Sequence, residues 1–391
     1  MRLAVFIKAT TLHKDFGGLE TQNKTLCEGL AGLGHRVVVF TPARELTKAS
    51  EEESGVSYRF IPCTYRMLLA SVDPANWYTR SYATFLQEHH KEAFDVVVSQ
   101  SSAGIGVIKR KKSLGVKIVG IAHGTIGGEI QTVLNSGTGL PYLVKHIPAL
   151  AYGAVNFFGR QRDYIHGCDK IAAVSTAVKA SLINETYCDQ AKVTVIHNGL
   201  DPTAVPQKDW AAKPDKEPIK IMYTGRIEES KGLKELVLAC QGIPGIFLNI
   251  IGDGPILEDL KRLSRDLKMS QKTLFYGRLP HEKVLELYAC CDLFVLPTKR
   301  LEGLPMTLVE ASFAGLPIIA TDIGGNKDVV ENGINGILIK DGRMETITKA
   351  ITDLLANRTS MPQMGMNGKI KADKYFTLNK MLSDYEKLCT F

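Results

Sequence analysis

Residues 293–322, LFVLPTKRLEGLPMTLVEASFAGLPIIATD, combine two apolar runs with a helical stretch between them. The first run, at 292–297, is continuous, as in strands that are buried on both faces, and a second such run begins at Pro317. A helix is expected to start near Pro305, because proline is favoured at the first helical position. This strand–helix–strand unit predicts a parallel sheet covered by helices.

The same alternation extends over the rest of the 391 residues. Further strand-like runs lie at 2–9, 35–42, 94–100, 117–124, 170–175, 192–199, 219–226, 247–254, 273–279 and 336–340. A stretch rich in Pro, Lys and Asp at 201–218 interrupts the series and predicts a linker. We therefore predict an α/β chain with two doubly wound, Rossmann-like domains at 1–200 and 219–372, and a closing helix at 373–391. In such sheets, ligands bind beyond the carboxyl ends of the strands.

The composition is that of an ordinary globular protein, with 45% hydrophobic and 23% charged residues. It excludes extended disorder, collagen-like chains and disulfide scaffolds. The eight cysteines form no Cys-x-x-Cys pair and no zinc-type cluster with histidine, so we expect reduced thiols. The first 15 residues pass directly into a strand pattern without a cleavage-type site, which predicts a cytoplasmic protein.

Two carboxylates stand where the first strand of the 293–322 unit meets its helix. Glu302 lies in the loop beside Gly303, and Glu310 lies in the second helical turn, so the two cannot share one helix face. Such a pair suits a polyhydroxylated ligand, because a carboxylate accepts two hydroxyl donors, and the free N–H groups of the helix start suit an anion. The alternative is that Glu310 pairs with a Lys or Arg and Glu302 is a loop charge.

Two cations follow an earlier strand, in the stretch TGRIEESKGLKEL at 224–236. Arg226 ends the strand, and Lys231 stands at the start of the next helix, where a positive charge opposes the helix dipole. A guanidinium fork and an ammonium point charge at one turn suit a diphosphate. The alternative is local neutralisation by Glu228 and Glu229.

Two glycines and a histidine are further candidate site residues. Gly17 and Gly18 directly precede a helix and would let a ligand approach backbone N–H groups. His123 ends a buried-type strand, where it could bond a substrate hydroxyl or phosphate, or be a satisfied structural residue. The dinucleotide fingerprint is incomplete, because a leucine replaces its third glycine in the segment 252–257, which disfavours a Rossmann dehydrogenase.

Taken in order, these pieces resemble the retaining glycosyltransferases of family 4, which have the GT-B fold. The matching stretches are GGLETQ (17–22), IAHGT (121–125), KVTVIHNGLD (192–201), TGRIEESKG (224–232), IIGDGP (250–255), LFYGRL (274–279) and EGLPMTLVEASFAGLPIIATDIGG (302–325). The Glu-(seven residues)-Glu element is the most specific of them. The resemblance implies two Rossmann-like domains facing across a cleft, with the C-terminal helix packing back toward the N-terminal domain.

The resemblance also implies a nucleoside-diphosphate sugar as the donor, held mainly by the C-terminal domain. Glu310 would bind the ribose hydroxyls and Glu302 the sugar ring. Arg226 and Lys231 would hold the diphosphate, whose developing charge they would stabilise in the transition state. The catalytic set implied in this way is His123, Arg226, Lys231 and Glu302.

The remaining donor contacts come from the same resemblance. Gly18 would approach the diphosphate from the N-terminal domain, and His123 would face the transferred sugar. Arg278 would meet the base through its backbone, and Gly303 and Leu304 would complete the donor site. Two positions depart from the family pattern: His197 stands where a Pro is expected, and Phe16 stands where the starch- and glycogen-synthase branch has a Lys.

The predicted function is a retaining hexosyl transfer to a glycan, lipid-linked or small-molecule acceptor, in cell-envelope glycan synthesis. No cofactor and no metal are expected, because the sequence has no Asp-x-Asp, Walker or Gly-x-Ser-x-Gly motif. We expect no nucleic-acid partner. The alternatives are a GT-B-fold nucleotide-sugar epimerase and a non-catalytic sugar-nucleotide-binding protein.

The basic excess of the chain is local. Residues 101–200 carry 11 positive and 5 negative side chains, which is +6 of the net charge of +7. This third includes the run 109–112 (KRKK) and the apolar segment 140–159, which we expect to be a partly buried or interfacial helix rather than a membrane span. The pattern favours an anionic membrane surface beside the acceptor site, on the cytoplasmic face. The alternative is a soluble enzyme with a solvated basic surface.

Overall fold

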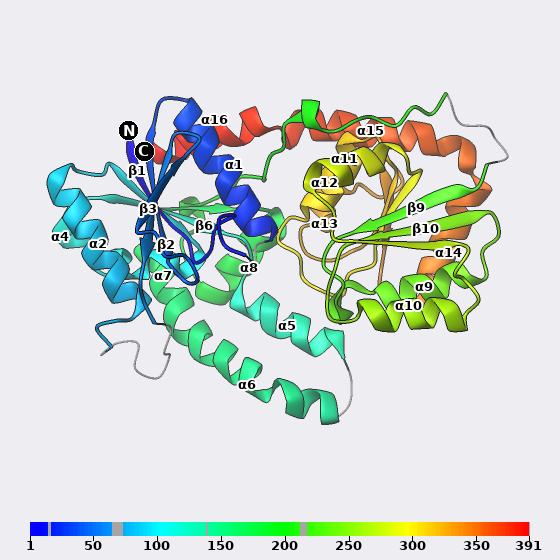
Figure 1. Cartoon of the computed structure of the whole chain (residues 1–391), viewed down its shortest axis with the longest axis horizontal. Helices are drawn as coiled ribbons and strands as arrows, with labels where there is room; N and C mark the ends of the chain where they lie inside the picture. Colours follow the sequence, from blue (N-terminus) through cyan, green and yellow to red (C-terminus); the bar gives the residue numbers. More distant parts are fainter. Residues whose placement is uncertain (15–16, 65–72, 138–139, 212–216, 391) are drawn as a thin grey trace. The chain divides into compact units, whose positions relative to one another are not determined.

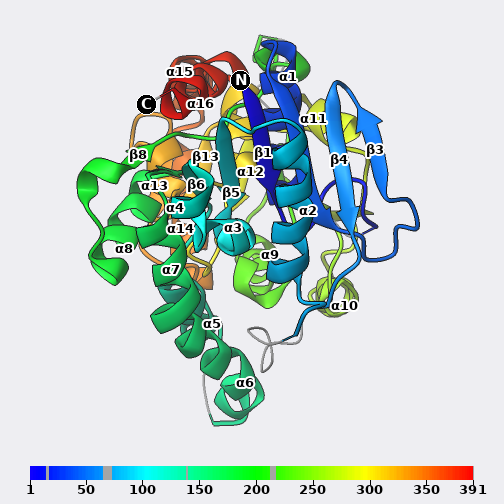
Figure 2. The ribbon, with the colours of Figure 1, turned by 90° about the vertical axis from the view of Figure 1, so that its left-hand side faces the viewer.

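The computed structural model describes residues 1–14, 17–64, 73–137, 140–211 and 217–390. The chain forms two compact units, drawn in Figures 1 and 2: unit 1 comprises 1–127, 151–196 and 381–391, and unit 2 comprises 128–150 and 197–380. Phe16 and part of the predicted linker, 212–216, lie outside the described residues. The domain limits expected from the sequence stay predictions.

Unit 1 is built on an eight-stranded sheet with the order β3-β4-β2-β1-β5-β6-β7-β8. The strands are β1 (Arg2–Phe6), β2 (Arg36–Pro42), β3 (Ser50–Glu53), β4 (Val56–Ile61), β5 (Val96–Gln100), β6 (Lys117–Ala122), β7 (Lys170–Ala173) and β8 (Val193–Val195). All neighbouring strands pair in parallel except β3, which pairs antiparallel with β4 at the edge. The strands predicted at the continuous apolar runs are confirmed. The sequence analysis did not predict β3 and β4.

Helices cover both faces of this sheet, and Figure 1 shows α1 on one side and α2 and α4 on the other. The helices of the first half of the chain are α1 (Gly18–Gly32), α2 (Trp77–Lys91), α3 (Ile105–Ile108), α4 (Lys111–Leu114), α5 (Ile126–Ser136), α6 (Leu140–Asn156), α7 (Arg162–Gly167) and α8 (Thr176–Thr186). Aromatic rings fill the space under α2: Phe6 stacks on Phe40 at 4.9 Å between ring centroids, and Phe85 stacks on Phe94 at 5.3 Å. This apolar packing stabilises the sheet that carries the N-terminal site residues.

Unit 2 is a six-stranded parallel sheet with the order β11-β10-β9-β12-β13-β14. Its strands are β9 (Ile219–Thr224), β10 (Ile246–Ile251), β11 (Thr273–Gly277), β12 (Leu293–Leu296), β13 (Ile318–Thr321) and β14 (Gly336–Ile339). Its helices after β9 are α9 (Leu233–Gln241), α10 (Leu257–Asp266), α11 (His281–Ala289), α12 (Met306–Phe313), α13 (Asn326–Val329), α14 (Met344–Ala356) and α15 (Met361–Tyr375). Figure 1 shows α9, α10 and α14 on one face of this sheet and α11, α12 and α13 on the other.

The last helix, α16 (Leu378–Cys389), packs on unit 1 rather than on unit 2, to which its first residues belong. The side chain of Leu382 occupies the space beside Gly29 of α1, where a Cβ on the glycine would meet the leucine methyl groups at 2.6 Å. Glu386 lies 3.1 Å from the imidazole Nε2 of His35. The prediction that the C-terminal helix packs back on the N-terminal domain is therefore confirmed.

Candidate functional site

Three predicted donor residues, Arg226, Lys231 and Glu302, lie at the switch point of the unit 2 sheet, where the strand order reverses. Strands β9 and β12 are neighbours, with Ile221 opposite Leu293, yet the connections that leave them lead to opposite sides of the sheet. Diverging connections open a crevice at the carboxyl ends of the two strands, which is where ligands bind in such folds. The loop after β9 carries Arg226 and Lys231, and the loop after β12 carries Glu302.

Lys231 and Glu302 form an ion pair across this switch point. The ammonium Nζ lies 2.5 Å from the carboxylate Oε1, and the side chains are 17% and 12% exposed. The hydroxyl of Thr298 lies 3.1 Å from the same carboxylate oxygen. Lys231, expected to bind the diphosphate, and Glu302, expected to bind the sugar, therefore pair with each other in the absence of a ligand. Glu302 is not an isolated loop charge.

Backbone contacts fix the β12 loop on its neighbours. The N–H of Lys299 donates to the carbonyl of Ser230 at 2.7 Å, and the hydroxyl of Thr321 donates to the carbonyl of Thr298 at 2.6 Å. The N–H of Gly325 donates to the carbonyl of Glu302 at 2.9 Å, and a Cβ at Gly325 would overlap the next carbonyl of this loop. Glycine is required there because the two loops approach so closely. These bonds preorganise Glu302 before any ligand arrives.

Arg226 differs from Lys231 in its surroundings. Its side chain is 72% exposed, and its Nε lies 3.4 Å from the carboxylate of Glu228. The backbone of Arg226 is fixed, because the hydroxyl of Tyr223 donates to the carbonyl of Arg226 at 2.9 Å. The alternative from the sequence was neutralisation by Glu228 and Glu229; Glu228 does pair with Arg226, whereas Lys231 pairs with Glu302.

Glu310 is buried in α12, where both of its carboxylate oxygens have partners. The hydroxyl of Tyr288 donates to Oε2 at 2.8 Å, and Nε2 of His281 lies 2.9 Å from Oε1. The bond to Glu310 raises the pKa of His281 above its ordinary value, against the opposing effect of partial burial. The partners are a histidine and a tyrosine on α11 rather than the Lys or Arg of the alternative.

The other predicted donor residues of unit 2 lie on the same edge of the sheet. Arg278 follows β11 and is exposed, whereas Leu304 is buried beneath the loop that carries Gly303. Helix α12 begins at Met306, which confirms the predicted start near Pro305, but Pro305 is the N-cap residue and not the first helical one. Its first N–H groups therefore lie next to the Glu302 loop.

In unit 1, His123 follows β6 and belongs to a chain of hydrogen bonds. Its Nε2 lies 2.6 Å from Oε1 of Gln100, whose Nε2 donates to Oδ1 of Asn23 at 2.8 Å. Because the Gln100 amide nitrogen is used on Asn23, its oxygen must accept, so His123 donates through Nε2. The unprotonated Nδ1 can then accept a bond from a hydroxyl but not donate one to a phosphate. Burial lowers the pKa of His123 to about 4, which keeps the ring neutral.

Gly18 is the first residue of α1, one of the longer helices of unit 1. No described atom lies within 4 Å of the position that a Cβ would take there. The carboxylate of Glu20 accepts a bond from the N–H of Gly17 at 2.9 Å, which caps the helix. Gly17 and Gly18 are both exposed at this helix start.

The basic run 109–112 is partly neutralised by contacts that the sequence did not predict. Lys109 lies 2.7 Å from a carboxylate oxygen of Asp163, and Lys111 lies 2.8 Å from one of Asp169. The apolar segment 140–159 forms α6 and the turn after it, with Pro148 inside the helix. In the described part of the chain, we find no helix with the length and apolarity that crossing a bilayer requires.

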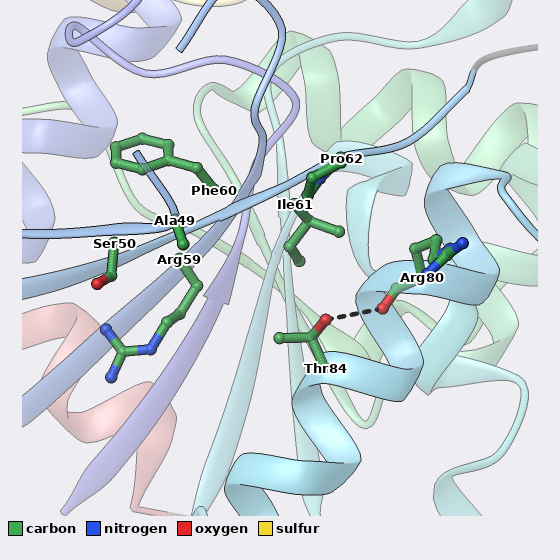
Figure 3. Close-up of a pocket in the computed structure, with 8 residues that line it drawn as sticks. All are labelled: Ala49, Ser50, Arg59, Phe60, Ile61, Pro62, Arg80 and Thr84. Atoms are coloured by element: carbon green, nitrogen blue, oxygen red, sulfur yellow. Dashed lines mark hydrogen bonds between the residues drawn. The ribbon is translucent and has the colours of Figure 1, made fainter. Parts of the chain in front are cut away.

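A separate hollow of about 540 Å³ lies at the β3–β4 edge of unit 1 (Figure 3). It is lined by Ala49, Ser50, Arg59, Phe60, Ile61, Pro62, Arg80 and Thr84. Figure 3 shows the hydroxyl of Thr84 bonded to the carbonyl of Arg80 one helical turn earlier, which is a local helix contact. None of the predicted site residues lines this hollow, so we assign it no part in the donor site.

Two family descriptions match this chain. "Glycosyltransferase Family 4" matches residues 16–204, and "Glycosyl transferases group 1" matches residues 205–371. The chain belongs to the family 4 glycosyltransferases. The division between the two matches falls within the predicted linker, and the resemblance inferred from the motifs is confirmed.

Curated relatives match part of this family 4 chain. The GDP-mannose-dependent alpha-(1-6)-phosphatidylinositol monomannoside mannosyltransferase of Mycolicibacterium smegmatis is 30% identical over 159 residues, which are 38% of this chain and 42% of the relative. The chain spans about half the length of the curated relatives it matches, 58% and 42% for the first two.

Two solved structures share the whole fold. Sucrose-phosphate synthase from Thermosynechococcus elongatus has a TM-score of 0.80 at 18% identity, covering 99% of this chain and 98% of that one. The Anabaena protein HepE, in complex with UDP-glucose, has a TM-score of 0.75 at 17% identity and covers both chains completely. At such identities the likeness establishes the fold, and the predicted GT-B architecture is confirmed.

Sequence reasoning missed the residues that orient the predicted ones in this glycosyltransferase. They are Thr298, His281 and Tyr288 in unit 2, and Gln100 and Asn23 in unit 1. Gln100 ends a buried strand, and Thr298 lies two residues beyond one. A polar residue at the end of a buried strand could have indicated both of them from the sequence. Tyr288 and Asn23 lie within helices, where the sequence offers no comparable signal.

Proposed function

We propose that this chain is a retaining glycosyltransferase that moves a hexose from a nucleoside-diphosphate sugar to a glycan, lipid-linked or small-molecule acceptor, in cell-envelope glycan synthesis. The observation that carries the proposal is the Lys231–Glu302 ion pair at the switch point of unit 2. A cation and a carboxylate held this close suit a ligand that is anionic at one end and hydroxylated at the other.

The proposed transfer requires stabilisation of the leaving diphosphate more than it requires a protein nucleophile. The bond between the anomeric carbon and the β-phosphate oxygen breaks, and negative charge grows on the leaving diphosphate. Lys231, Arg226 and the N-terminus of α12 are the groups of unit 2 that would stabilise this charge. Glu302 would hold a sugar hydroxyl, and Glu310 would hold the ribose.

We infer front-face transfer. The acceptor oxygen forms its bond to the anomeric carbon on the face from which the diphosphate leaves, and its proton passes to the departing phosphate oxygen. The products are the nucleoside diphosphate and a glycoside that keeps the donor's configuration. No oxidant, reductant or further co-reactant is needed for the balance.

The test begins with a thermal-shift screen of UDP-, GDP- and ADP-sugars, followed by NMR of the product formed with the stabilising donor. The base stays open, since the names of the similar proteins include both GDP-mannose and UDP-glucose. We expect an α-linked product from an α-linked donor. A β-linked product contradicts retention, a donor changed in the absence of acceptor indicates an epimerase, and binding without turnover indicates a non-catalytic protein.

We further propose that the transfer needs no divalent metal, because Arg226 and Lys231 would supply the positive charge at the diphosphate and the sequence has no Asp-x-Asp motif. EDTA should leave the initial rate unchanged within about twofold. A rate that falls with EDTA and returns with Mg²⁺ or Mn²⁺ would contradict this part of the proposal alone.

We also propose that the enzyme attaches peripherally to an anionic membrane surface on the cytoplasmic face, where a lipid-linked acceptor is available. The local charge of +6 in residues 101–200 supports this attachment. The ion pairs of Lys109 and Lys111 weaken the contribution of the run 109–112. Co-sedimentation with anionic and neutral vesicles tests the attachment as a whole.

A further inference from the structure

Helix α6 exposes the side that soluble proteins normally bury. Five large apolar side chains of α6 and the turn after it are 46–71% exposed: Val144, Ile147, Tyr152, Val155 and Phe158. Val144, Ile147, Val155 and Phe158 follow the spacing of one helix face, at intervals of three, eight and three residues. Contiguous exposed apolar surface of this kind marks an interaction site.

The opposite side of α6 is the one with partners. Gly153 and Asn156 are buried, and the hydroxyl of Tyr142 donates to the carbonyl of Val133 in α5 at 3.0 Å. Figures 1 and 2 both show α6 beside α5. The helix is therefore anchored by one face and presents its apolar face outward.

The charged side chains within the stretch 130–162 are all basic, and Glu129 and Asp163 flank this stretch. Residues 130–162 include Lys145, Arg160 and Arg162 but no Asp or Glu. The guanidinium of Arg162 lies 5.9 Å from the ring centre of Phe158, so positive charge borders the apolar side chains directly. An apolar helix face with a basic border is complementary to an anionic lipid surface.

We propose that this exposed face of α6 is the surface that inserts into the headgroup region of an anionic bilayer. The inference rests on the proposed membrane attachment and assigns it to α6, in place of the run 109–112. Helix α6 has 17 residues, fewer than the roughly 20 that a spanning helix needs, so it would lie in the plane of the interface.

The test compares two sets of exposed substitutions in the full chain. The α6 variant carries Ile147→Gln, Val155→Gln and Phe158→Gln, and the matched control carries Met366→Gln and Ile370→Gln on α15, where the side chains are similarly exposed. Glutamine is a good helix former, so both variants should keep the wild-type circular dichroism. Vesicles are phosphatidylglycerol and phosphatidylcholine in equal parts, with pure phosphatidylcholine as the neutral probe.

We expect wild type and control to pellet with the anionic vesicles, less so at high salt, and the α6 variant to bind at least about tenfold more weakly. Phe158→Trp should be quenched by brominated lipid, and Met366→Trp should not. Equal pelleting of the α6 variant and wild type overturns the assignment to α6. So does a wild-type dimer that the α6 variant dissociates, because a second copy would then cover the face.

Calorimetry with UDP, GDP and ADP in turn separates this inference from the proposed transfer. The α6 variant should bind nucleotide like wild type, because its substitutions lie outside the donor residues. If vesicles bind and none of the three nucleotides does, the docking surface stands and the transfer fails. If nucleotide binds and wild type ignores anionic vesicles, the docking surface fails and the transfer stands.

Discussion

Nζ of Lys231 lies 2.5 Å from Oε1 of Glu302, so that two residues 71 positions apart close the switch point of the C-terminal sheet. The pair is largely buried, and the cost of removing two charges from water is offset by their attraction and by the hydroxyl of Thr298. A bound diphosphate would compete with Glu302 for Lys231. The ion pair would thus keep the proposed site organised without donor and would release both groups when a donor binds.

Substitution of the two cations should separate catalysis from stability. Lys231→Ala and Arg226→Ala should each lower kcat by about 10²-fold or more, roughly 3 kcal/mol, because both act on charge that develops in the transition state. Only Lys231→Ala should also lower the melting temperature, since it leaves the carboxylate of Glu302 buried without its cation, whereas Arg226 is 72% exposed. Steady-state kinetics and calorimetric melting measure the two effects. Lys283→Ala, a change at an exposed residue of α11, is the matched control. Wild-type turnover by Lys231→Ala would show that Lys231 has no part in the mechanism.

The two glutamates should differ in what they lose. Glu310→Ala should weaken binding of the free nucleoside diphosphate, because ribose contacts are alike in the ground and transition states. Glu302→Ala should mainly lower kcat and donor-sugar selectivity. Tyr288→Phe removes only the bond to Oε2 of Glu310 and should weaken nucleotide binding roughly fivefold, about 1 kcal/mol. Isothermal calorimetry measures all three variants, and equal losses for Glu302→Ala and Glu310→Ala would contradict the assigned roles.

The strand pattern of the sequence predicts the sheets because their strands are buried on both faces and therefore continuously apolar. Strand β3, Ser50–Glu53, could not be predicted in this way, because its sequence SEEE is polar and lies at an exposed edge. The sequence also indicates Lys231 and Glu302 but not their contact. Partners such as Asp163 for Lys109 lie 54 positions away, and only the tertiary fold brings them together.

The His281–Glu310 contact should make stability depend on pH. The bond raises the pKa of His281 in the folded state, so the folded chain holds this proton more tightly than the unfolded chain. The stabilisation is complete below the ordinary pKa of 6.5 and is lost as the pH rises through the higher folded value. Because His281 is half exposed, the difference between wild type and His281→Gln should be only about 0.5 kcal/mol. Urea unfolding at acidic and alkaline pH measures it; a difference that grows with pH would contradict the assigned proton.

The bond between Gln100 and His123 yields the last prediction, because it determines the tautomer of a residue expected to face the sugar. Nitrogen-15 NMR of histidine-labelled protein should show His123 protonated at Nε2 and titrating near 4 rather than near the ordinary 6.5. Gln100→Leu removes the acceptor, so both tautomers should appear and kcat should fall roughly tenfold, about 1.4 kcal/mol, with nucleotide binding unchanged. Gln87→Leu, an exposed change on α2, is the control. A wild-type spectrum with the proton on Nδ1 would contradict the hydrogen-bond chain, and unchanged kcat in Gln100→Leu would show that the orientation of His123 has no part in the transfer.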